Sequence, residues 1–248
     1  MALLTQVSAR TVVFFKNKTV WRFFLPSQII VSLALSVLVA FFPFFSLAET
    51  AELEVRLNPL SISVFLLVFP ITALITMVEV MRGIFYGEEM TASFVPVPNR
   101  DVMRFSVKLI ENIAASLVAG VAIAYFGLYA LKTFLKLPPV GIDVVAAIAV
   151  MVAPYCMIRQ SMSLTATVVN DDAGLGRSWR LTGKCGMSLC LFYLFFMFFP
   201  LLLFLLTVSF LKFPEAVNNF LALMSLFFSA MTQAAFLSYL YIRLKDEA

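Results

Sequence analysis

Basic and aromatic residues cluster between residues 159 and 184, and their types suit contact with anionic groups. Arg177, Arg180 and Lys184 recur at helical spacing and fall within about 60° of one another on a helix. Trp179 falls on the opposite side of that helix. Guanidinium and ammonium groups bind lipid phosphates at a membrane surface, where a Trp indole also favours the headgroup layer. We therefore expect a short interfacial helix over residues 172–183.

This helix would begin at an N-cap within Asn170–Asp172 and stop at Gly183. An alternative is an ordinary basic loop without a specific ligand. The candidate lipid- or partner-contact residues are Arg159, Arg177, Ser178, Trp179, Arg180, Lys184 and Trp21.

A second group of charged residues lies at the ends of two long apolar runs. Glu79 and Arg82 end one run, and Lys108 and Glu111 begin the next. Charged residues at membrane depth cost free energy and usually find partners. We expect intramembrane charge pairs between Glu79 and Lys108 and between Arg82 and Glu111. A proton or ion relay is the alternative use of these groups.

The sequence offers no catalytic constellation. It has no His, which removes the commonest general base and the commonest zinc ligand. No nucleophile with a base, no phosphate-binding glycine loop and no metal-ligand cluster can be identified. A disulfide among Cys156, Cys185 and Cys190 would be unusual on the cytoplasmic side. Cys185 and Cys190 have no metal-ligand neighbours and are expected to be small apolar filler. We expect no enzymatic activity, no cofactor and no metal.

The elements that position these residues are membrane spans. The chain has 248 residues, of which 62% are hydrophobic and 13% charged, whereas a soluble domain has about 25% charged residues. Six apolar runs reach the length of about 20 residues that a spanning helix needs. They cover approximately residues 24–45, 60–81, 106–131, 144–165, 187–211 and 216–242. The predicted fold is all-α: one membrane domain over residues 1–248, with six transmembrane helices in three hairpins.

Charge asymmetry predicts the orientation. Of the 18 Lys and Arg residues, all but Arg56, Lys132, Lys136 and Lys212 fall on one side of the six-span arrangement. Because cytoplasmic loops carry the excess of Lys and Arg, both termini are expected in the cytoplasm. The first run could also be a signal peptide cut near Ser46-Leu47-Ala48, but its length favours an uncleaved span. Residues 8–23, with Trp21, predict an interfacial helix or an extended inner end of the first span.

A resemblance appears around the basic cluster. Residues Arg159-Gln160-Ser161-Met162-Ser163-Leu164, then Val168-Val169, then Gly176-Arg177-Ser178-Trp179-Arg180-Leu181-Thr182 resemble the YciC-like family of bacterial six-helix membrane proteins. A similar pattern occurs in the membrane domain of some glycerophosphoryl diester phosphodiesterases, whose catalytic domain this chain lacks. The resemblance implies six helices and a location in the bacterial cytoplasmic (inner) membrane. It implies no reaction.

These observations predict a non-enzymatic integral membrane protein that acts as a scaffold or accessory subunit. Its expected partners are anionic lipids of the inner leaflet and other membrane proteins or further copies of itself. The net charge of only +4 gives no reason to expect a nucleic acid. The alternative is a permease half that dimerises and pairs with a separate ATPase, with Ala173–Thr182 as its coupling helix. A lipid-handling enzyme is disfavoured because the catalytic groups are missing.

Overall fold

The structure, a computed structural model, describes residues 2–41, 45–47, 55–57, 59–86, 100–130, 152, 154–171, 174–211 and 214–246. These residues are helical apart from two short antiparallel strands, which confirms the all-α fold class. The elements are α1 (Ala2–Lys16), α2 (Lys18–Phe41), β1 (Phe45–Leu47), β2 (Val55–Leu57), α3 (Pro59–Tyr86), α4 (Arg100–Ala130), α6 (Met162–Val168), α7 (Leu175–Leu181), the 3-10 helix η2 (Thr182–Lys184), α8 (Gly186–Leu211) and α9 (Glu215–Asp246). A further helical stretch covers residues 154–160.

Within these ranges, three helices are long and apolar enough to cross a membrane. They are Leu67–Tyr86 of α3, Arg100–Gly127 of α4 and Val217–Asp246 of α9. They correspond to the second, third and sixth predicted spans. Helix α9 has 32 residues, a length of about 48 Å, whereas a hydrocarbon core is about 30 Å thick. Helix α9 is therefore longer than a hydrocarbon core is thick.

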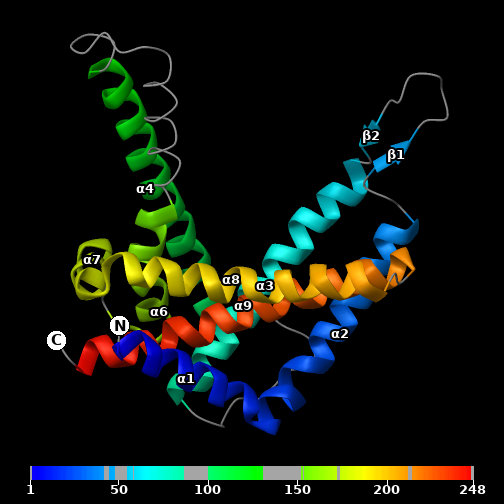
Figure 1. Cartoon of the computed structure of the whole chain (residues 1–248), viewed down its shortest axis with the longest axis horizontal. Coiled ribbons are helices and arrows are strands. Elements are labelled where there is room, and N and C mark those ends of the chain that lie inside the picture. Colours follow the sequence, from blue (N-terminus) through cyan, green and yellow to red (C-terminus); the bar gives the residue numbers. More distant parts are fainter. Residues whose placement is uncertain are drawn as a thin grey trace.

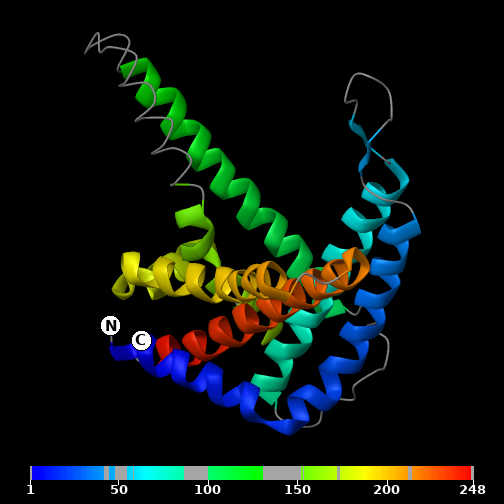
Figure 2. The same ribbon diagram turned by 45° about the vertical axis from the view of Figure 1, so that its right-hand side comes forward.

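Helix α9 is the common packing partner of the bundle. It contacts α1, α2, α3, α6 and α8, and α8 runs alongside it in both views (Figures 1 and 2). The ring of Phe227 lies 5.1 Å from that of Phe69 in α3, and the ring of Phe228 lies 5.2 Å from that of Phe15 in α1. The buried α9 residues include Met231, Ala234, Ala235, Phe236, Leu237 and Leu240. A larger share of the apolar stretch of α9 is buried inside the bundle than of α3 or α4, which agrees with its central place.

The described helices do not support three successive hairpins. Helices α3 and α4 lean away from each other (Figures 1 and 2). Helix α2 packs more extensively on α9 than on α3, its neighbour in sequence. The short connections in the sequence predict that neighbouring helices pair. In the structure, the apolar faces of α1, α2 and α3 pack mainly on α9.

The predicted fourth span, residues 144–165, is not one continuous helix where the structure describes it. Residues 144–151 and 153 lie outside the described ranges. The helix over 154–160 breaks at Ser161, and α6 begins at Met162. The Ser161 amide donates to the Ile158 carbonyl, and the Leu164 amide donates to the Ser161 carbonyl. These tight three-residue bonds replace the α-helical pattern at the break.

The N-terminal segment forms a helix of its own. Helix α1 starts at Ala2 and is separated from α2 by a turn at Asn17, so the segment is not simply an extension of the first span. Leu4, Val7 and Thr11 are buried, and their spacing places them on one face of α1. This face belongs to the packing of α1 against α9.

Candidate functional site

The guanidinium of Arg159 joins the helix over 154–160 to α7 and η2. Its side chain is buried, with 6% exposure. Nε donates to Thr182 Oγ1 at 2.8 Å, Nη1 to Tyr155 Oη at 3.0 Å and Nη2 to the Trp179 carbonyl at 2.7 Å. The guanidinium carbon also lies 4.6 Å from the Trp179 ring centroid, within cation–π range. Arg159 therefore holds this part of the fold together from within.

Helix α7 is anchored by two hydroxyls and presents its other side outward. Ser178 Oγ donates to the Arg159 carbonyl at 2.9 Å, and Thr182 lies beside the same carbonyl. Both anchors are buried, whereas Arg177, Trp179 and Arg180 are exposed. The helix is capped by Gly174 rather than by Asn170–Asp172, and Gly183 lies within η2 rather than ending the helix. Three candidate contact residues thus share one accessible helix.

Asp171 contacts charged and polar groups of α7 and α9 at the same end of the bundle. Its Oδ1 lies 3.3 Å from Arg177 Nη1, and its Oδ2 lies 2.8 Å from Lys245 Nζ. Tyr241 donates a short hydrogen bond to Oδ2. The preceding Asn170 has a φ of 53°, a left-handed conformation that Asn tolerates better than most residues. The loop therefore ties α7 to the last turns of α9.

These contacts favour the charged form of Asp171. Hydrogen bonds from Lys245 and Tyr241, together with the charges of Lys245 and Arg177, lower the pKa of its carboxyl from 3.8 to about 2. The group thus remains a carboxylate at every physiological pH.

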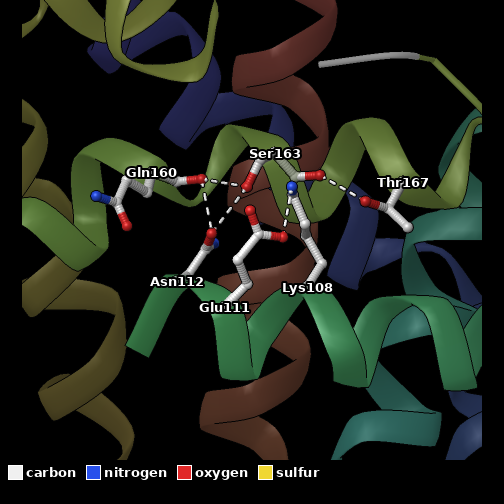
Figure 3. Close-up of polar contacts among 6 residues, drawn as sticks. All are labelled: Lys108, Glu111, Asn112, Gln160, Ser163 and Thr167. Carbon is white, nitrogen blue, oxygen red and sulfur yellow. Dashed lines mark hydrogen bonds and ion pairs between the residues drawn. The ribbon is translucent and has the colours of Figure 1, made fainter. Parts of the chain in front are cut away.

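A buried polar network joins α4 to the helix break at Ser161 (Figure 3). The Leu164 amide donates to the Ser161 carbonyl and not to the Gln160 carbonyl, as it would in a regular α-helix. The Gln160 carbonyl instead accepts from Asn112 Nδ2 at 3.3 Å and from Ser163 Oγ at 2.8 Å. Asn112 and Ser163 are fully buried. A carbonyl freed by a kink must be satisfied by another donor in an apolar interior, and Asn112 supplies one from α4.

The predicted charge pairs form with different partners. Arg82 lies 3.6 Å from Glu79 within α3 and 3.8 Å from Asp101 of α4. Lys108 pairs with Glu111 within α4 at 2.7 Å (Figure 3). Residues three apart lie on one helix face, which explains both short-range pairs. The end of α3 meets the start of α4 at Asp101, and the ion pairs found among the described residues do not include Glu79–Lys108 or Arg82–Glu111.

The two remaining candidate residues are Trp21 and Lys184. The Trp21 nitrogen donates to the Phe15 carbonyl at 2.6 Å, and its ring stacks on Phe228 at 5.8 Å. Its indole therefore packs against the bundle, and its position at headgroup depth stays a prediction. The side chain of Lys184 lies outside the described parts of the chain.

Sequence reasoning missed three groups that organise this end of the bundle. From the sequence, Asp171 is expected only as part of a helix cap, and no role is expected for Asn112 or Tyr241. The sequence signal for Asn112 is an amide in an apolar run, which indicates an interhelical hydrogen bond. Asp171 carries no comparable signal, because its partners Tyr241 and Lys245 lie far along the chain.

Among the described residues, no group of three His, Cys, Asp or Glu side chains could hold a metal ion. Cys156, Cys185 and Cys190 are free thiols. Comparison of the chain with family models, curated proteins and solved structures gave no match. Membership of the YciC-like family stays a prediction.

Replacing Asn112 with Leu should destabilise the bundle. The apolar side chain leaves the freed Gln160 carbonyl without its donor from α4, which costs about 1 kcal/mol or more. Equilibrium unfolding in mixed micelles measures the change. Ser116→Ala is the matched control, because its only described contact to Gln160 is a 3.4 Å hydrogen bond; it should cost less. Equal costs would contradict the assigned role of Asn112.

Replacing Asp171 with Asn should remove an acid-induced step. Because the folded-state pKa of about 2 lies below the ordinary 3.8, the stabilisation by Asp171 is complete above about pH 4. It is lost as the pH falls toward 2. Limited acid proteolysis of the loop across this range should show a transition in the wild type and in the control Asp101→Asn. A transition that persists unchanged in Asp171→Asn would assign it to another group.

Proposed function

We propose that the chain is a non-enzymatic integral membrane protein of the bacterial cytoplasmic membrane, acting as a scaffold or accessory subunit. It would contact anionic lipids and partner membrane proteins through the polar end of its bundle. The observation that carries this proposal concerns α7. This helix is anchored by the buried Ser178 and exposes Arg177, Trp179 and Arg180. An indole beside cations is the composition that favours the headgroup layer.

The proposal includes six spans with both termini in the cytoplasm. Helices α2 and α8, with 24 and 26 residues, reach the length of about 20 residues that a span needs. Basic residues at the end of α3, at the start of α4, in α7 and in the last turn of α9 are linked through shared loops and acids. The charge bias toward one side supports a cytoplasmic location for this end.

A permease half with a separate ATPase is the second candidate. Helix α7 favours it, because a coupling helix is a short loop helix that projects from the bundle. Purification in mild detergent, followed by identification of bound proteins and lipids, separates the two. A stoichiometric ATPase would replace the scaffold proposal, and recovery of a lone lipid-free chain would contradict both.

Reporter fusions test the topology. With both termini inside, a fluorescent protein after Ala248 should fluoresce and alkaline phosphatase at that point should stay inactive. A truncated fusion after Lys136 should give the opposite result, because an odd number of spans precedes it. Active phosphatase after Ala248 would refute the six-span arrangement.

Removing the exposed cations of α7 should weaken lipid retention. Each basic residue near an anionic surface contributes about 1 kcal/mol, so Arg177→Ala with Arg180→Ala should lower retention of phosphatidylglycerol about tenfold or more. Native mass spectrometry of the purified chain measures the bound lipid. Lys132→Ala with Lys136→Ala, on the proposed outer side, is the control. Equal retention in both double variants would leave α7 without a lipid role.

A further inference from the structure

The charge of Arg159 is buried without a counter-charge among the described residues. Its three described hydrogen bonds go to a threonine hydroxyl, a tyrosine hydroxyl and a backbone carbonyl, all neutral. The ion pairs formed within the described ranges do not include it. Burying an unpaired charge is costly. The ring of Trp179 offsets only part of this cost through its quadrupole.

Two N–H groups of the guanidinium have no described partner. Each of Nη1 and Nη2 carries two hydrogens, and each makes one described hydrogen bond, to Tyr155 and to the Trp179 carbonyl. A planar guanidinium presents such donors in a fork that matches the oxygens of a phosphate. Holding α7 in place uses the other donors and leaves these two without a partner among the described residues.

Gly183 leaves an opening next to this fork. The residue is exposed, and a Cβ added to it would meet Arg159 Nη2 at 3.8 Å with no other described contact within 4 Å. A larger side chain at residue 183 would start at contact distance from the guanidinium and could occupy this open space. A glycine here therefore gives a ligand access to a charge that is otherwise enclosed.

We propose that Arg159, Trp179 and Gly183 form a binding site for a phosphate group, with the phosphodiester of an anionic phospholipid as the source that fits a membrane protein. The inference rests on the proposed function and gives its lipid contact a specific site. The phosphate would supply a counter-charge to Arg159 that the described residues do not provide. Trp179, which is 38% exposed, borders the site and offers apolar contact to the glycerol end of a lipid. Arg180, on the same helix as Trp179, adds an exposed cation beside the buried Arg159 site.

Trp179 provides a reporter for the site. The chain has two Trp residues, and Trp21→Phe keeps a ring against Phe228 while leaving Trp179 as the sole indole. The full chain in neutral detergent is titrated with short-chain phosphatidylglycerol, with the diacylglycerol of equal chain length and with inorganic phosphate. We expect a saturable change in Trp179 fluorescence with phosphatidylglycerol and none with diacylglycerol. A response to inorganic phosphate as well would show that a free phosphate is also accepted.

Gly183→Val closes the opening without removing the charge. Loss of hydrogen bonds to a charged group should weaken phosphatidylglycerol binding about tenfold. Gly183→Ala, whose Cβ would lie at an ordinary contact distance, should lose less. Gly176→Val is the matched control, because a Cβ there meets nothing within 4 Å, and it should bind as the parent does. Arg159→Lys keeps the charge but loses the fork, so it should also bind more weakly.

Three outcomes would overturn the site. These are equal binding by Gly183→Val and Gly176→Val, an equal response to diacylglycerol, or no response to either phosphate compound. Failure of this site can be distinguished from failure of the proposed function. Phosphatidylglycerol that co-purifies with the chain, but binds equally to Gly183→Val, would keep the lipid contact and reject only this site.

Discussion

An apolar interior offers no hydrogen-bond partners, so every polar group placed in it must be satisfied by the chain itself. The helix break at Ser161 shows the effect of this requirement on the packing of several helices. It frees the Gln160 carbonyl, which then accepts from Asn112 of α4. That contact fixes α4 against α6, and the loop that follows carries Asp171 to the last turns of α9. The position of α7 depends on the same segment, because Ser178 donates to the Arg159 carbonyl.

The sequence predicted the helical class, the segments that span α3, α4 and most of α9, and an exposed helix with Arg177 and Arg180. These features follow from local quantities: apolar length and helical spacing. The cap residues of α7 did not follow, because the helix is capped by Gly174. The partners of charged groups could not be predicted in the same way. Arg82 meets Asp101 rather than Glu111 because of the register between α3 and α4, and composition does not determine register. Trp21 packs inward because Phe228, distant in sequence, offers a stacking surface.

Arginines of similar sequence context occupy different environments in this fold. Arg177 is 43% exposed and pairs with a carboxylate, whereas Arg159 is buried among neutral acceptors and aromatic rings. Charge counting along the chain treats these residues as equivalent. Burial without a counter-charge among the described residues makes Arg159 the stronger candidate for an anionic ligand.

The central place of α9 has a consequence for biogenesis. Synthesis proceeds from the N-terminus, so α1, α2, α3 and α8 leave the ribosome before the helix they all contact. Until α9 arrives, their inward faces, including Leu4, Val7 and Val78, have no final partner. During translation these faces would contact solvent, lipid or other proteins until α9 is made. The bundle is therefore complete only after its last helix is synthesised.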